Sequence, residues 1–104
     1  MEKREIIKEI INGLECLTKE NPSELIFMLD YYEDTYYEDS ISALILKWEQ
    51  LGYGDFSSSF PITTKLVAKL EFVNDGVERP REVYADIIAL AKDALKEMKE
   101  YEIS

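Results

Sequence analysis

The sequence predicts a mainly α-helical protein, a compact bundle of four to five antiparallel helices. Two observations lead to this prediction. Apolar residues recur at helical spacing along most of the chain, and proline, glycine or asparagine interrupts the pattern between the periodic segments. Helices joined by such short connections pack as antiparallel neighbours. With 104 residues, of which 46% are hydrophobic, we expect one domain over 1–104 with a single core.

Two helices are expected in the first third of the chain. Residues 2–20 place their isoleucines and leucines at the i, i+3, i+4 spacing of one helix face. The residues of this face are Ile6, Ile7, Ile10, Ile11, Leu14 and Leu17. Asn21 then provides a cap and Pro22 a first helical position. The continuous apolar run that follows predicts a buried second helix over 22–32.

A third helix is expected over about 40–51, with Asp39 or Ser40 as its N-cap and Gly52 just after its C-terminus. Its apolar stripe consists of Ile41, Leu44, Ile45, Trp48 and Leu51. Glycines and serines dominate residues 52–59, so this stretch is predicted to be a loop.

Residues 61–74 fit two periodicities. A helical stripe is formed by Ile62, Leu66, Leu70 and Val73. Strand-like alternation is formed by Phe60, Ile62, Leu66, Ala68, Leu70 and Phe72. A strand of this length would be unusual, so a helix is favoured, and an α+β fold with a short hairpin in 60–74 is the alternative. A last helix is expected over 80–101, with Pro80 in its first turn.

The charge balance points to a basic protein as partner. The chain has 12 basic and 22 acidic residues, a net charge of −10. Residues 21–60 hold most of the imbalance, with eight acids and Lys47 as the one base. Such a surface repels nucleic acid and anionic membranes and attracts basic proteins. We therefore expect no direct contact with nucleic acid and no membrane association.

The residue types present exclude several kinds of chemistry. The chain has no histidine and a single cysteine, Cys16, so there is no Ser-His-Asp triad, no Cys-His dyad and no histidine or thiolate zinc site. No glycine-rich phosphate loop occurs either. We expect a binding protein rather than an enzyme, with no cofactor and with Cys16 as a half-buried structural thiol. The sequence shows neither a secretory signal nor an apolar run of about 20 residues, so a cytoplasmic location is expected.

The segment from residue 30 to residue 39 is the strongest candidate for a binding surface. The tetrad Tyr-Tyr-Glu-Asp occurs in it twice, and tyrosines surrounded by carboxylates suit the docking of a cationic protein. The predicted partner-binding residues are Asp30, Tyr31, Tyr32, Glu33, Asp34, Tyr36, Tyr37, Glu38 and Asp39. In the alternative interpretation, two of these tyrosines face the core, and the acids solvate a turn and the start of the third helix.

The stretch from Asp30 to Phe56 resembles bacterial toxin immunity proteins of the colicin type. Its matching features are the tyrosine pairs with their acids, and Lys47-Trp48 before a glycine-containing segment. The resemblance implies a small acidic helical protein that binds a toxin nuclease through these tyrosines and acids. That family would end near Phe56, whereas nearly 50 further residues follow in this chain. The resemblance therefore points to a more distant immunity protein, such as one directed against a contact-dependent toxin.

Asp39-Ser40-Ile41 is similar to the Asp-Ser-Leu attachment motif of acyl carrier proteins, which implies phosphopantetheine on Ser40. The same residues also form an ordinary helix N-cap. The expected function is an immunity or inhibitor protein that neutralises a basic toxin, in particular a nuclease. The alternatives are an acidic adaptor or assembly subunit and, less favoured, a carrier protein modified at Ser40.

Overall fold

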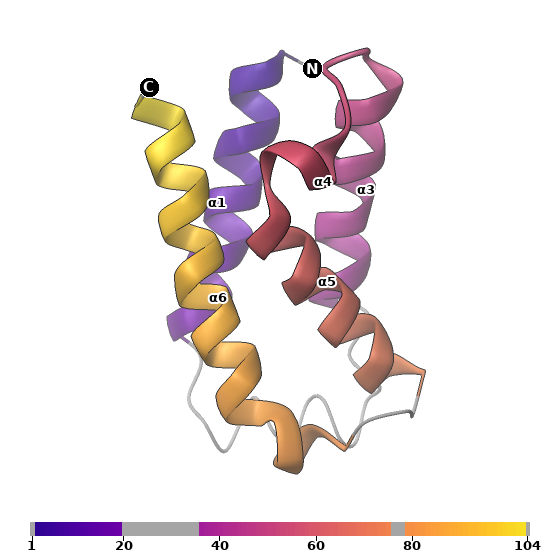
Figure 1. The fold of residues 1–104 in the computed structure, drawn as a ribbon, viewed down its shortest axis with the longest axis vertical. Helices are drawn as coiled ribbons and strands as arrows, with labels where there is room; N and C mark the ends of the chain where they lie inside the picture. Colours follow the sequence, from indigo (N-terminus) through magenta and orange to yellow (C-terminus); the bar gives the residue numbers. More distant parts are fainter. Residues whose placement is uncertain (1, 20–35, 76–78, 104) are drawn as a thin grey trace.

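The computed structural model describes residues 2–19, 36–75 and 79–103, without the side chains of 36–40, 74, 80 and 81 (Figure 1). Five helices lie in this part of the chain and no strand does, so the predicted mainly α-helical bundle is confirmed. The helices are α1 (Lys3–Lys19), α3 (Tyr36–Gln50), α4 (Phe56–Ser59), α5 (Pro61–Asn74) and α6 (Pro80–Ile103). The second helix predicted over 22–32 lies outside the described residues.

The four long helices form a closed ring. α1 packs against α3 and α6, and α5 packs against the same two helices from the opposite side. Successive helices of the ring run in opposite directions, and both chain ends lie at one end of the bundle (Figure 1). The short helix α4 contacts α3 and α5. No described helix is long and apolar enough to cross a membrane.

The core is assembled from one face of each long helix. All six residues of the predicted apolar face of α1 are buried, and each fully buried aliphatic side chain contributes about 1.5–3 kcal/mol. α6 adds Ile87, Ala91, Ala94 and Met98, all fully buried. The two alanines permit close approach of a neighbouring helix, because interaxial distance depends on side-chain size at the contact. At the surface, Lys99 Nζ on α6 pairs with Glu15 Oε1 on α1 at 3.3 Å.

The predicted start of the third helix was wrong. α3 begins at Tyr36, so Asp39 and Ser40 lie inside the helix and neither is its N-cap. Residues 36–39 contain no proline or glycine that would stop a helix, and carboxylates in a first turn interact favourably with the helix dipole. Asp39 and Ser40 are residue types that often cap helices, but here the helix has already begun before them.

The predicted loop over 52–59 was wrong in its second half. Phe56–Ser59 form one helical turn, α4, and the Phe60 backbone N–H donates to the Phe56 carbonyl at 2.8 Å. Phe56 and Phe60 are both buried, so the apolar contacts of two phenyl rings outweigh the preference of the serines for irregular structure. The hairpin alternative for 60–74 was also wrong, because Pro61–Asn74 form the single helix α5.

The end of α3 agrees with the prediction for Gly52. This glycine has a φ of 81°, and its N–H donates to the Glu49 carbonyl at 3.1 Å. The Tyr53 N–H donates to the Trp48 carbonyl at 3.2 Å, which completes a Schellman motif. Leu51, expected in the apolar stripe, is 45% exposed because it follows the last residue of α3 in this turn.

Cys16 is exposed, so the prediction of a half-buried thiol was wrong. At 100° per residue it lies on the side of α1 opposite the buried isoleucines and leucines.

Candidate functional site

The nine residues predicted to contact a partner divide into two groups. Asp30, Tyr31, Tyr32, Glu33 and Asp34 lie outside the described residues. Tyr36, Tyr37, Glu38 and Asp39 form the first turn of α3, of which the structure describes the backbone. The second group is therefore joined rigidly, through the helix, to the side chains of α3 that follow. Those side chains form one wall of a groove.

A hollow of about 310 Å³ lies between α3 and α5. Each helix contributes side chains at positions i, i+3, i+4 and i+7, which lie on one helix face. On α3 these residues are Ser42, Ile45, Leu46 and Glu49, and on α5 they are Thr64, Val67, Ala68 and Glu71. We refer to these eight residues as the α3–α5 groove.

The middle of the α3–α5 groove is apolar and partly open to solvent. Val67 is only 7% exposed, whereas Leu46 is 55% exposed. Ile45 and Ala68 are partly buried between these extremes. The groove thus combines a well-packed base with an accessible leucine, an arrangement typical of apolar protein-binding surfaces.

Carboxylates lie at both ends of the α3–α5 groove. Glu49 and Glu71 are exposed, and none of the eight described lining residues is basic. α3 and α5 run in opposite directions (Figure 1). Glu49 lies close to the C-terminus of α3 and Glu71 close to the C-terminus of α5, so the two carboxylates border opposite ends of the groove.

Aromatic rings hold the C-terminal end of α3 in place. The Trp48 ring lies 5.4 Å from Tyr53, 5.5 Å from Phe60 and 6.1 Å from Tyr101, in edge-to-face geometry that favours aromatic pairs. Lys3 Nζ lies 5.2 Å from the centre of the Trp48 ring and 5.5 Å from that of Tyr101. These cation–π contacts connect the beginning of α1 to the end of α3, the helix end that carries Glu49.

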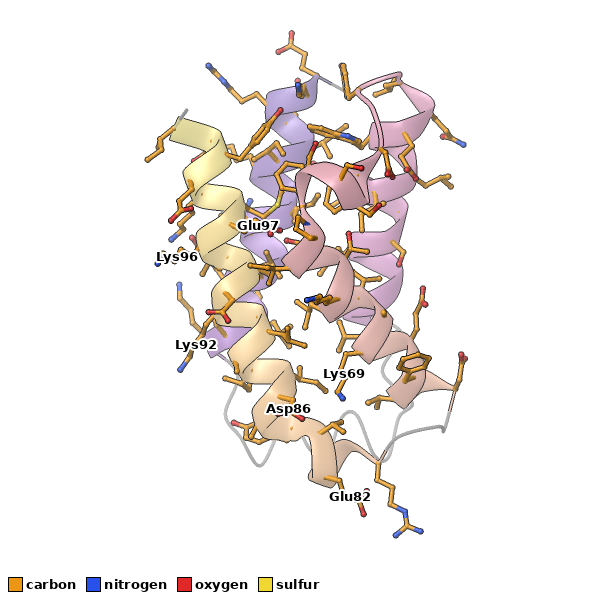
Figure 2. All side chains as sticks on the ribbon, viewed as in Figure 1. Lys69, Glu82, Asp86, Lys92, Lys96 and Glu97 are labelled. Carbon is orange, nitrogen blue, oxygen red and sulfur yellow. The ribbon has the colours of Figure 1, made fainter. Side chains whose placement is uncertain are left out.

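Glu97 fixes the other wall of the α3–α5 groove. Its carboxylate reaches from α6 to the first residues of α5, where Thr63 is fully buried (Figure 2). Lys92 and Lys96 instead project from the outer side of α6 (Figure 2). The groove is thus built on two helices that other parts of the bundle hold at their ends.

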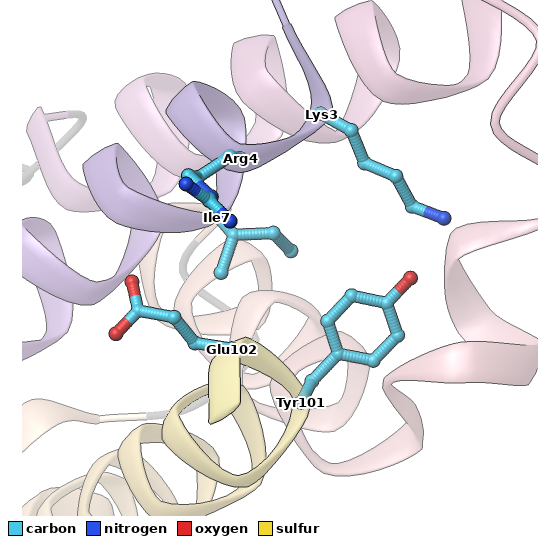
Figure 3. A pocket seen from close by; sticks show the side chains of 5 residues that line it. All are labelled: Lys3, Arg4, Ile7, Tyr101 and Glu102. Atoms are coloured by element: carbon cyan, nitrogen blue, oxygen red, sulfur yellow. The ribbon is translucent and has the colours of Figure 1, made fainter. Parts of the chain in front are cut away.

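A second hollow, of about 350 Å³, lies where the two ends of the chain meet. Lys3, Arg4 and Ile7 from the beginning of α1 face Tyr101 and Glu102 from the end of α6 (Figure 3). Two of its five described lining residues are basic, in contrast to the acid-bordered groove. Sequence reasoning missed this hollow because its two halves are separated by almost the whole chain.

Asp55 precedes α4 and accepts hydrogen bonds from two serine hydroxyls. Ser58 Oγ lies 2.8 Å from Oδ2, and Ser57 Oγ lies 3.0 Å from the same oxygen. The hydroxyl of Ser58, and then that of Ser57, lower the pKa of Asp55 below its usual value. This carboxylate therefore stays charged to lower pH than an ordinary aspartate.

No protein-family model, curated protein or solved structure matches the chain.

Proposed function

We propose that the protein binds and neutralises a basic protein, acting as an immunity or inhibitor protein against a toxin of the nuclease class. The observation that supports this most directly is the concentration of acids in residues 21–60, which hold eight acids and one base. All of α3 lies in this segment, and one wall of the α3–α5 groove belongs to α3.

The physics of association favours a cationic partner. A net charge of −10 accelerates encounter with a basic protein and disfavours binding to nucleic acid. A nuclease domain presents basic surface where it holds phosphates. An acidic protein that covers this surface would exclude the substrate without any chemistry of its own.

Capture from the native host tests the proposal. Tagged protein would be incubated with host lysate at low and high salt, and the bound species identified by mass spectrometry. We expect one stoichiometric basic protein whose binding weakens with salt, because exposed charges are screened. The captured protein would then be assayed for nuclease activity with and without its inhibitor. Recovery of no basic protein, or an undiminished activity in the complex, would contradict the proposal.

Alanine substitutions of Tyr31, Tyr32, Tyr36 and Tyr37 test whether the predicted segment contacts the partner. If it does, one or two of the four single variants should cost more than about 2 kcal/mol of binding. Tyr84→Ala, at a partly buried position of α6, is the control and should leave affinity unchanged. Uniformly small effects would assign the contact to another surface.

An adaptor or assembly role is the second candidate function. It is favoured by the apolar side chains that remain exposed, among them Leu46 at 55%, Phe72 at 47% and Ile103 at 84%. Sedimentation analysis would then show self-association that these residues govern. Attachment of a prosthetic group at Ser40 is not part of the proposal, because Ser40 is the fifth residue of α3 rather than a residue at its start.

A further inference from the structure

We infer that the α3–α5 groove receives an amphipathic α-helix of the partner, with apolar residues in its middle and a basic residue towards each end. This inference deepens the proposed function and rests on it, since it names the element of the basic partner that docks and the surface that receives it.

The shape of the groove suits a helix. Its two walls are antiparallel helices, and each presents one stripe of side chains spaced i, i+3, i+4 and i+7. A third helix can lay its own ridge of side chains between two such stripes. A stripe from position i to i+7 is about 10 Å long, which corresponds to about two turns of a docked helix.

The apolar part of the groove determines the middle of the docked helix. Leu46 is 55% exposed next to Ile45, and Val67 and Ala68 line the opposite wall. Covering these side chains would remove apolar surface from water, which favours binding. Leucine, isoleucine or methionine at the centre of the incoming helix provides the matching surface.

The carboxylates determine the ends of the docked helix. Glu49 lies at one end of the groove, and Glu71 lies at the other end on the opposite wall. Lysine or arginine side chains about seven residues apart would reach both ends of a stripe of this length. Pairs of this kind select the partner and its orientation even where each adds little affinity.

Charge also decides between the possible occupants. A second copy of the chain carries a net charge of −10 and would approach an acid-bordered groove unfavourably. Residues 20–35 of the same chain contain five acids and no base, so they cannot supply the basic ends either. A basic segment of another protein is the occupant that meets both requirements.

Binding of a model peptide tests the inference directly. The probe is a fluorescein-labelled amphipathic helix of leucine and lysine, about four turns long. Two control peptides replace either every lysine by glutamate or every leucine by glutamine. We expect fluorescence anisotropy to detect saturable one-to-one binding of the leucine–lysine helix alone. Equal binding of the lysine–glutamine helix would show attraction by charge only and would overturn the inference.

Paired charge reversals locate the binding. The variant Glu49→Lys/Glu71→Lys should weaken binding of the leucine–lysine peptide about tenfold relative to Asp93→Lys/Glu100→Lys. The control pair consists of exposed acids on α6 and changes the net charge by the same amount. Equal weakening in the two double variants would overturn the inference, because binding would then follow net charge and not position.

A matched pair of apolar truncations tests the centre of the groove. Leu46→Ala should weaken peptide binding about fivefold or more, whereas Ile103→Ala, which removes an exposed side chain outside the groove, should not. Both side chains are largely exposed, so the folded state should persist, which circular dichroism would verify. The inference would be overturned if Leu46→Ala left peptide binding unchanged. It would also be overturned if the substitution changed only the self-association of the protein, as measured by sedimentation.

The failure of this inference is distinguishable from failure of the proposed function. Suppose that a basic partner from the host binds the wild type and the Glu49→Lys/Glu71→Lys variant equally. The groove would then not be the docking site, but the proposed function would stand. Absence of any basic partner, together with peptide binding that requires Glu49, Glu71 and Leu46, would contradict the proposed function alone.

Discussion

Glu97 on α6 caps the N-terminus of α5 by accepting hydrogen bonds from Thr63 across 34 residues of sequence. Oε1 accepts from the Thr63 backbone N–H at 3.1 Å and from the Thr63 hydroxyl at 2.9 Å, and Oε2 accepts from the Ile62 N–H at 3.0 Å. α5 has no capping side chain of its own, because Phe60 occupies the N-cap position. A carboxylate from another helix therefore satisfies amide groups that a helix start leaves unpaired.

Removing this carboxylate should destabilise the fold. Glu97→Ala should lower the free energy of unfolding by about 2–3 kcal/mol, since charge-assisted hydrogen bonds are lost and the buried Thr63 hydroxyl loses its acceptor. Urea denaturation followed by circular dichroism measures the change. Glu100→Ala on the same helix is the control and should cost less than about 0.5 kcal/mol. Equal costs would contradict the capping role.

The contact of Lys3 with the aromatic rings should be measurable in stability and in fluorescence. Lys3→Gln should cost about 0.5–1 kcal/mol, because its ammonium lies 5.2 Å from the centre of the Trp48 ring. Trp48 is the only tryptophan, so its emission spectrum reports directly on the change. Lys8→Gln, an exposed lysine on the same helix, is the control. An unaltered Trp48 spectrum in Lys3→Gln would show that this contact does not persist in solution.

Gly52 should resist substitution for a reason of backbone geometry alone. Its φ is 81°, and an added Cβ would meet no atom within 4 Å, so the cost of Gly52→Ala comes from the left-handed conformation. This cost should be about 1 kcal/mol. Thermal unfolding would measure it against Gln50→Ala, at the last residue of α3. A neutral or stabilising Gly52→Ala would mean that the Schellman motif is not maintained.

The stability that Asp55 contributes should depend on pH. Its pKa is lowered in the folded state, chiefly by Ser58 and then by Ser57, so its contribution is present above the pKa of the unfolded chain. That contribution is lost as pH falls through the lowered pKa of the folded state. Asp55→Asn should therefore be less stable than wild type at neutral pH, and the difference should disappear in acid.

Denaturant unfolding of Asp55→Asn across this pH range checks the sign. Asp93→Asn, at an exposed position of α6, is the matched control for loss of one negative charge. A difference between Asp55→Asn and wild type that grew towards low pH would contradict the assignment of the serine hydroxyls as donors to the charged carboxylate.

The part of the candidate surface that sequence reasoning reached is the acidic start of α3. Tyr36, Tyr37, Glu38 and Asp39 were selected for their types and spacing, and α3 carries them in its first turn. The α3–α5 groove was not predicted, although the sequence shows that Ile45 and Leu46 are apolar residues of the same predicted helix. A periodic pattern shows which residues share a face of one helix, but it does not show which two helices are neighbours.

The sequence by itself determined the helical class, the buried face of α1 and the uneven distribution of charge, because helix periodicity and charge are local properties of the chain. Only the tertiary structure decided that Glu97 caps α5, that Lys3 lies beside Trp48 and that Leu46 lines a groove with Ala68. Each of these contacts joins residues of different helices. Such contacts arise when several helices bury their apolar faces together, and this packing fixes neighbours that no local pattern encodes.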